Sequence, residues 1–323
     1  MVELLIAALA FTAARVDDGH PVWSHDGRYV AFDRTRELGG GFTNTSIEIV
    51  RSDGRRLRHI TPTSVSVDAV RPVWSPDDGW LAFEVASRYL PTTVQWERRN
   101  GRNANALSIG SDSSNTVSAP SWAPDNRRLA VAARVGPRSG LYVAERTSGR
   151  SARVAAGPVR FTAWSPDGRR IAFADAISVA LVAPGGGDIR RLTAPPSRIS
   201  WSPDGTRLAY ATGCAVGIVA ADGTGRPPEL TPCPPEVETS TPSWSPDGRR
   251  IAYSVCRRPV CSVFVAPAGP NAVGGVQIPR ARDPAWAPNG RLIVYTHVAG
   301  SAPTRLYLVR PDGHGVHPLI RGQ

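Results

Sequence analysis

The sequence predicts an all-β protein, a seven-bladed β-propeller of four-stranded antiparallel blades, and three observations lead to this prediction. Seven of the nine tryptophans open the same ten-residue phrase, whose clearest copy is Trp-Ser-Pro-Asp-Gly-Arg-Arg-Ile-Ala-Tyr from Trp244 to Tyr253. The copies follow at intervals between 37 residues (Trp164 to Trp201) and 51 residues (Trp23 to Trp74), a period typical of solenoids and propellers. With 30 prolines and 31 glycines, the chain also suits a fold with many turns. A ring of six blades is the alternative.

The ten-residue phrase predicts strand A, a tight turn and strand B of each blade. Ser-Pro-Asp-Gly fits a type I turn, with a short polar residue first, Pro second and Gly fourth. After the turn, Ile251 and Tyr253 alternate as in a half-buried strand. The other copies vary this turn with His25, Asn126 and Asn289, and the second copy carries what we interpret as an extra Asp78. The phrase opens at Trp23, Trp74, Trp122, Trp164, Trp201, Trp244 and Trp286.

A second phrase after each copy predicts strands C and D. Examples are Leu141–Ala144 and Val263–Ala266. Several lead into Asp-Gly and a further short apolar stretch, which is a hairpin signal. Four short strands per repeat make one propeller blade.

We expect a single propeller domain over residues 15–323, because the repeat runs to the end of the sequence. Residues 1–14 contain an apolar run that ends in small residues, as in a secretory signal peptide. The alternative is a strand that closes the ring, since Glu3 stands where a signal would carry basic residues. The run is too short to span a membrane, and we favour the signal.

The four cysteines predict two local disulfides. By strand order we pair Cys214 with Cys233 around the fifth repeat, and Cys256 with Cys261 across the connection between strands B and C of the sixth. A zinc site and free thiols are the alternatives, but the cysteines lack the two-residue spacing of a zinc knuckle. Disulfides and a signal together indicate a periplasmic or secreted protein.

The net charge of +11 does not by itself predict nucleic-acid binding. All 38 basic residues are arginines, which indicates a compositional bias, and many follow the Asp-Gly turns around the whole ring. We interpret them as a solvated basic surface.

Alternation of the strands places the connections on two faces of the ring. The A–B and C–D turns share one face, and the B–C and D–A connections share the other, where insertions often form the binding face. We assign two B–C connections to residues 33–45 and 86–104. Aromatic and arginine side chains are typical of interaction hot spots, although Trp96 could instead fold back onto the blade edge. The predicted partner-binding residues are Arg34, Arg36, Tyr89, Trp96, Arg98, Arg99 and Arg102.

The sequence offers no catalytic or metal-binding motif that we can assign. The turn aspartates, Asp167, Asp204 and Asp247 among them, recur at equivalent positions, so we predict that they bond to nearby backbone N–H groups. His297 and His314 are expected on opposite faces, which argues against a shared metal. No nucleophile elbow and no nucleotide-binding fingerprint occurs, and we expect no cofactor.

Trp-Ser-Pro-Asp-Gly-x-x-Ile-Ala-Phe/Tyr, followed by Leu-Thr at Leu192-Thr193 and Leu230-Thr231, resembles the TolB-type propeller repeat over about residues 20 to 323. The family includes the periplasmic TolB protein, which couples envelope proteins, and the propellers of prolyl-oligopeptidase-type hydrolases. This sequence shows neither the α/β domain of TolB nor a hydrolase domain. Neither function therefore transfers whole, and we predict a non-catalytic, monomeric propeller that binds a protein or peptide on its loop face, which carries the B–C and D–A connections. The alternatives are a propeller enzyme acting on a glycan, since oligogalacturonate lyases are similar in fold, and a separate partner of a peptidase.

Overall fold

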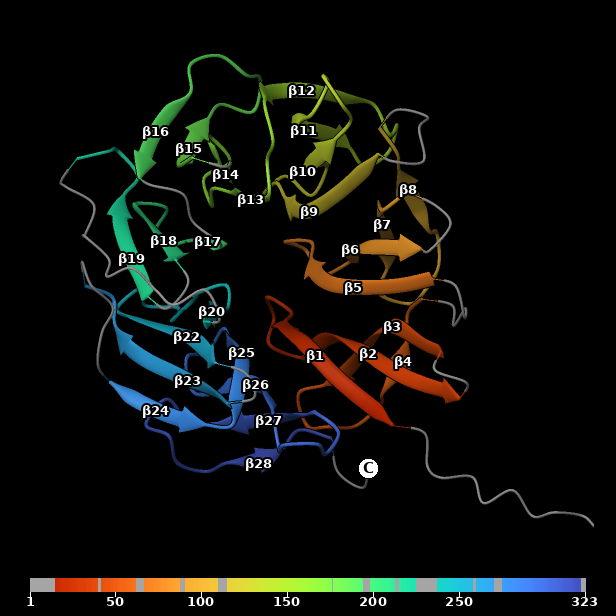
Figure 1. Cartoon of the computed structure of the whole chain (residues 1–323), viewed down its shortest axis with the longest axis vertical. Coiled ribbons are helices and arrows are strands. Elements are labelled where there is room, and N and C mark those ends of the chain that lie inside the picture. The colour runs from red at the N-terminus through yellow and green to blue at the C-terminus, as the bar shows by residue number, and fades with distance from the viewer. Residues whose placement is uncertain are drawn as a thin grey trace, which may run out of the picture.

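The structure is a computed structural model that describes residues 15–39, 42–61, 67–87, 91–109, 115–175, 177–193, 198–212, 215–224, 237–257, 260–269 and 275–320. Every regular element of these residues is a β-strand, and they include no helix long and apolar enough to cross a membrane. The strands form seven antiparallel sheets arranged as a ring (Figure 1). The predicted fold class is confirmed, with seven blades rather than six.

Each blade uses consecutive strands, with strand A innermost (Figure 1). Blade 1 comprises β1 (Val16–Trp23), β2 (Tyr29–Gly39), β3 (Phe42–Arg51) and β4 (Arg58–His59). Blade 2 comprises β5 (Val67–Trp74), β6 (Trp80–Ser87), β7 (Thr93–Arg98) and β8 (Asn105–Leu107). Blade 3 comprises β9 (Thr116–Trp122), β10 (Arg128–Arg134), β11 (Gly140–Glu145) and β12 (Ser151–Ala156). Blade 4 comprises β13 (Phe161–Trp164), β14 (Ile171–Ala174), β15 (Val179–Val182) and β16 (Arg190–Thr193).

The described part of blade 5 contains three strands, and strand A of blade 6 is divided in two. Blade 5 comprises β17 (Arg198–Trp201), β18 (Arg207–Thr212) and β19 (Ala215–Ala220). Blade 6 comprises β20 (Val237–Thr239), β21 (Ser243–Trp244), β22 (Arg250–Arg257), β23 (Val260–Pro267) and β24 (Val276–Pro279). Blade 7 comprises β25 (Ala281–Trp286), β26 (Ile293–His297), β27 (Arg305–Val309) and β28 (His317–Pro318).

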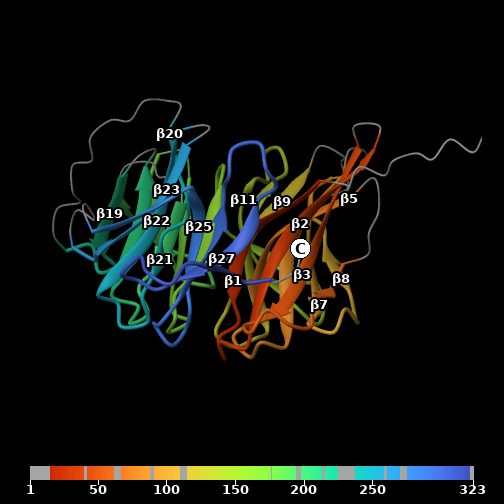
Figure 2. The same cartoon turned by 90° about the horizontal axis from the view of Figure 1, so that it is seen from below.

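The two faces of the ring are visible edge-on in Figure 2. The turn face carries the A–B and C–D turns. The two turns of a blade are hydrogen-bonded to each other: in blade 2, for example, the Arg99 N–H donates to the Gly79 carbonyl at 3.1 Å. The loop face carries the B–C and D–A connections. We keep these two names below.

The hydrophobic core is divided among the gaps between blades. Each of seven clusters of buried apolar side chains is built mainly from two neighbouring blades. Trp96 lies in the cluster between blades 2 and 3, together with Trp80 and Trp122, and is 1% exposed. It belongs to β7 rather than to a B–C connection, so its predicted placement is wrong, and it does not cover a blade edge either.

Blades 1 and 7 close the ring without exchanging a strand, because blade 7 has its own strand D, β28. The contact is made by residues near the start of β1. Thr304 donates its backbone N–H to Asp17 Oδ1 at 2.7 Å and its hydroxyl to the Asp18 carbonyl at 2.8 Å, while the Asp18 N–H donates to the Thr304 carbonyl at 3.0 Å. Val30, Phe32 and Leu308 lie in the apolar cluster of the same seam.

The Ser-Pro-Asp-Gly turn is held by its own side chains, as predicted. In five blades the Ser hydroxyl donates to the Asp carboxylate at 2.5–2.7 Å. Hydrogen bonds from the Ser202 hydroxyl and the Thr206 backbone N–H lower the pKa of Asp204 to about 2, and equivalent bonds lower the pKa values of Asp167 and Asp247. The turn glycines at positive φ are packed against the proline of the preceding blade's turn, as Gly168 is against Pro124.

Asp78 is not an insertion, contrary to the prediction. Trp80 follows Trp74 at the spacing with which Tyr29 follows Trp23, and its N–H bonds to Ser75 as that of Tyr29 bonds to Ser24. Asp78 therefore occupies the glycine position of the turn, with φ 55°.

The side chain of Asp78 accepts from the backbone N–H groups of His25 (2.7 Å) and Asp26 (2.8 Å) in blade 1. It also pairs with the ring of His25, Nδ1 to Oδ1 at 2.9 Å. Asn126 does the same for blade 2, because its Oδ1 accepts from the Asp77 N–H at 2.9 Å. His25 and Asp78 are both departures from the repeat, and the structure pairs them with each other.

Several arginines hold neighbouring blades together. The sixth residue after the phrase tryptophan is an arginine in blades 3 to 6, and in three of them its guanidinium lies over the next blade's tryptophan. Arg207 is one: it lies 5.0 Å from the Trp244 ring centroid and donates to the carbonyls of Gly248 and Ala268. These side chains are structural, so a solvated basic surface describes only part of the arginine content.

Candidate functional site

Strand A, the innermost strand of each blade, lines the central channel and carries a bulge in four of the blades. In four blades the residue three before the phrase tryptophan has a positive φ and precedes a proline: His20 (44°), Arg71 (55°), Ala119 (51°) and Asp283 (51°). Proline lacks an N–H and is found in sheets at bulges. The strand pairing shifts register at each of these places. Phe161 and Arg198 hold the equivalent position in blades 4 and 5.

Polar residues of strand B support these bulges from the preceding blade. Asp33 Oδ2 accepts from the Arg71 N–H at 3.1 Å, and Glu84 Oε1 accepts from the Ala119 N–H at 2.9 Å. The Ser254 hydroxyl accepts from the Asp283 N–H in the same way, at 3.4 Å. Sequence reasoning missed these residues. They could have been found from the sequence, because each is a polar residue directly after the apolar part of strand B, a position at which blades 3, 4 and 5 have alanine.

His20 and Asp33 form the best-defined ion pair of the channel, with Nδ1 2.8 Å from Oδ2. Burial disfavours the charged form of each group, but the contact outweighs it, so the pKa of His20 is raised and the pKa of Asp33 is lowered. The pair is therefore charged over a wider pH range than either group alone.

Arg198 begins β17 and is stacked on an aromatic ring. Its guanidinium carbon lies 4.3 Å from the Phe161 ring centroid. Among the described residues no carboxylate lies within ion-pair distance of it. Burial, and then the charge of Arg71, lower the pKa of Arg198.

The loop face carries most of the large apolar side chains that the structure leaves exposed. Leu38 (48%) and Phe42 (51%) flank the β2–β3 connection, Ile177 (63%) precedes β15, and Val260 (66%) begins β23. These three places are all B–C connections. A hollow of about 200 Å³ opens on the same face beside β7 and β9, lined by Pro91, Thr92, Thr93, Ser108, Ile109, Asn115 and Val117.

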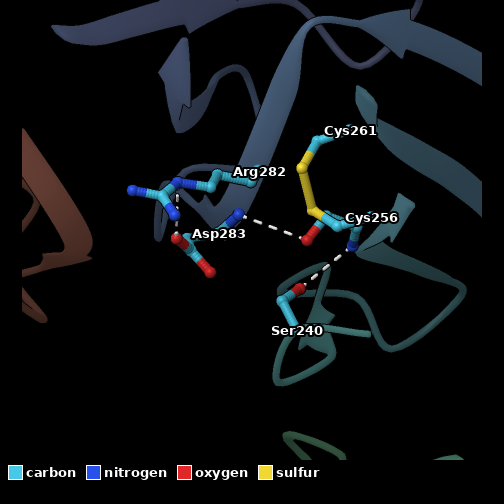
Figure 3. The surroundings of a disulfide bond; sticks show 6 residues. Ser240, Cys256, Cys261, Arg282 and Asp283 are labelled. Carbon is cyan, nitrogen blue, oxygen red and sulfur yellow. Dashed lines mark hydrogen bonds and ion pairs between the residues drawn. A yellow bond between two sulfur atoms is a disulfide. The ribbon is translucent and has the colours of Figure 1, made fainter. Parts of the chain in front are cut away.

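The predicted disulfide between Cys256 and Cys261 is present, and it joins β22 to β23 directly beneath Val260. Figure 3 shows it close to Ser240, to Arg282 and to the bulge residue Asp283. Cys214 and Cys233 lie outside the described residues, so their pairing stays a prediction.

The remaining predicted binding residues are divided between two faces. Arg34 and Arg36 lie on β2 and not in a connection: Arg34 is 2% exposed and pairs with Asp18 (2.6 Å) and Glu48 (3.3 Å), and Arg36 also pairs with Glu48. Their placement in the B–C connection is wrong because the β2–β3 hairpin extends through residues 33–45.

Arg98, Arg99 and Arg102 lie at the C–D turn of blade 2, on the turn face, so the predicted placement of these three is also wrong. Arg98 is stacked over Trp80 and Arg99 over Tyr29. Tyr89 is outside the described residues. The structure thus does not bring the predicted set together.

No group of three or more His, Cys, Asp or Glu side chains in the described part of the chain is placed to hold a metal ion. His297 lies at the end of β26 towards the loop face, and His314 lies in the C–D turn, as their predicted placement required. Burial lowers the pKa of His297.

The chain matches no family model and no curated protein. Its structure is similar to that of an oligogalacturonate lyase in complex with manganese, with a TM-score of 0.66 at 15% identity over 91% of this chain and 90% of that one. TolB from Acinetobacter baumannii gives 0.56 at 18% identity, over 85% of this chain and 66% of that one. A chain of the mitotic checkpoint complex gives 0.64 at 16% identity, over 96% and 95%. These likenesses support a TolB-type β-propeller fold. At such identities they show the fold alone.

Proposed function

We propose that this chain is a non-catalytic, TolB-like propeller that binds a protein or peptide through its loop face, in the cell envelope or outside the cell. The observation that carries the proposal is the position of the exposed apolar side chains. Leu38, Phe42, Ile177 and Val260 come from three blades, and each sits at a B–C connection. Exposed apolar side chains on a shared face are typical of interaction surfaces.

The disulfide supports both parts of this proposal. Cys256–Cys261 constrains the hairpin that presents Val260, and a constrained loop loses less conformational freedom on binding. Structural disulfides are typical of oxidising compartments, which agrees with an extracytoplasmic protein.

The test is affinity capture from an envelope extract, with the purified chain as bait. A variant with Leu38→Asp, Phe42→Asp and Val260→Asp should lose a partner that the parent retains. The matched control is Val316→Asp, because Val316 is 49% exposed but lies on the turn face. A partner lost equally from the control variant, or retained by the triple variant, contradicts the loop-face assignment.

A second candidate function is an enzyme that acts on a glycan, favoured by the likeness to oligogalacturonate lyase over nine-tenths of both chains and by the charged channel residues. Cleavage of an acidic oligosaccharide by the parent, with and without added manganese, would support this function over binding alone. Loss of that cleavage in His20→Gln, with an unchanged melting temperature, would locate the chemistry in the channel.

A further inference from the structure

We propose that the channel contains a carboxylate-binding site formed by Arg198 and Arg71, which takes an acidic side chain of a peptide entering from the loop face. The inference rests on the proposed peptide-binding function and gives it a ligand chemistry. Both arginines hold the channel-facing position three residues before a phrase tryptophan.

The two arginines approach the channel from well-separated parts of the ring. Arg71 belongs to β5 of blade 2 and Arg198 to β17 of blade 5, three blades apart in a ring of seven, and these two innermost strands face each other across the centre of the ring (Figure 1). The charge of Arg71 lowers the pKa of Arg198, which indicates that the two guanidinium groups lie within electrostatic reach. Two cations facing each other repel, and an anion between them would remove that repulsion.

Arg198 is held ready for such a ligand. The Phe161 ring under its guanidinium fixes one face of the side chain. Its five N–H donors form a planar fork that matches a carboxylate, and among the described residues it makes no ion pair that would occupy them. Arg71 is similar, since its contact to Glu84 is long (Nη1 to Oε2, 3.4 Å) and its side chain is 45% exposed.

The carboxylates around the channel have partners of their own. The charges of Asp283, Glu84 and Glu238 act on Arg198, but among the described residues none of them forms an ion pair with it. Asp33 contacts His20 and the Arg71 N–H, and Glu84 accepts from the Ala119 N–H. Asp283 lies 3.6 Å from Arg282 Nε. A carboxylate has about four acceptor positions, which leaves Glu84 and Asp283 able to accept from peptide N–H groups. A cation without an ion-pair partner among the described residues, beside spare acceptors, fits an acidic peptide, which offers a carboxylate and N–H donors together.

The site opens on the proposed binding face. Arg198 and Phe161 are the first residues of β17 and β13, and strand A runs from the loop face towards the turn face. A peptide bound on the loop face would therefore reach these residues first.

The experiment measures calorimetric affinity for three probes: hexaglutamate, hexaglutamine and trigalacturonate. The proteins are the parent, Arg198→Gln, Arg198→Lys, Arg71→Gln and the control Arg249→Gln, whose arginine is exposed on the turn face. Hexaglutamate should bind to the parent and hexaglutamine should not. Arg198→Gln and Arg71→Gln should each weaken hexaglutamate binding about ten- to hundredfold. Arg198→Lys should recover part of that loss, and the control should bind as the parent does.

Three results would overturn the inference. They are equal affinity for both peptides, hexaglutamate affinity unchanged in Arg198→Gln, and binding of trigalacturonate in place of hexaglutamate. The last would also favour the glycan enzyme. If partner capture is lost from the loop-face triple variant but retained by Arg198→Gln, the carboxylate site is wrong and the proposed function stands. Melting temperatures within a few degrees of the parent's make the comparison valid.

Discussion

The bond between His25 and Asp78 provides the sharpest test of how neighbouring blades are joined. Asp78→Gly restores the ordinary turn residue of the repeat, and a repeat-based argument alone would expect it to stabilise the protein. The structure predicts the opposite. The substitution removes a carboxylate, 6% exposed, that accepts from the N–H groups of His25 and Asp26 and from the His25 ring.

The expected loss can be estimated from these contacts. Each hydrogen bond to the charged group is worth about 1.5–3 kcal/mol, so the two backbone bonds contribute about 3–6 kcal/mol. Removing a non-glycine residue from positive φ returns about 1–2 kcal/mol, and water on the turn face satisfies part of the freed N–H groups. We expect Asp78→Gly to lower the free energy of unfolding by about 2 kcal/mol.

Asn126→Gly is the matched control. Asn126 has a similar φ, 59°, but makes a single neutral bond to the Asp77 N–H. One such bond is worth about 1 kcal/mol, which the relief of backbone strain nearly offsets. Its effect on stability should be close to zero.

A double variant extends the test. His25→Pro with Asp78→Gly recreates the proline-on-glycine contact seen where Gly168 meets Pro124, and proline has no N–H to satisfy. The double variant should therefore lose about 1 kcal/mol less than the sum of the two single variants. Urea denaturation of the parent, of His25→Pro, of Asp78→Gly and of the double variant measures this difference. Additive losses, or a stabilising Asp78→Gly, would refute the reasoning.

Three further predictions concern the core, the blade contacts and the ring closure. Burial raises the pKa of Glu97, so the native state holds the Glu97 proton more tightly than the unfolded state does. Glu97→Gln should raise the melting temperature at neutral pH, and the gain should vanish as pH falls through that raised pKa; a gain that persists in acid contradicts this cause. Arg207→Ala should lower the free energy of unfolding by about 2 kcal/mol, because it removes contacts with Trp244 and two carbonyls. Arg207→Lys should recover only part of this loss. Arg169→Ala, at an exposed arginine, should change the urea midpoint little. Deleting residues 1–14 should leave the melting temperature unchanged, since the described closure contacts begin at Arg15; a fall of several degrees would support the closing strand.

Local patterns in the sequence were sufficient for the turn and strand predictions. The Ser-Pro-Asp-Gly turn could be predicted because the bonds made by its serine and aspartate side chains lie within seven residues, as for Ser202, Asp204 and Arg207. Trp96 was misplaced although its own alternation with Val94 fits a strand, because the B–C connection of blade 2 was taken to be long. In the structure that connection ends at Thr92, and the arginines after β7 form a C–D turn.

The channel could not be predicted, because it joins residues that are far apart in the sequence. Arg198 and Arg71 share one channel only because the ring closes, and Asp33 contacts the bulge of the next blade at Arg71 as well as His20 in its own blade. The bulge itself can be predicted locally, because its residue directly precedes a proline that lies two residues before the phrase tryptophan. Its consequence, a side chain turned into the channel, depends on which strand is innermost.

The repeats within this chain separate residues that hold the ring from residues available for function. Positions that recur from blade to blade, such as the phrase tryptophan and the turn aspartate, make contacts that any blade needs, and five tryptophans donate their indole N–H to the preceding blade's strand A. The residue three before the tryptophan varies, with six residue types among seven blades: it is His20, Arg71, Ala119, Phe161, Arg198, Thr241 and Asp283 in order around the ring. A position that made the same structural contact in every blade would converge on one residue type, as the others do. Its variety in a channel that every blade lines is the reason to expect ligand recognition there.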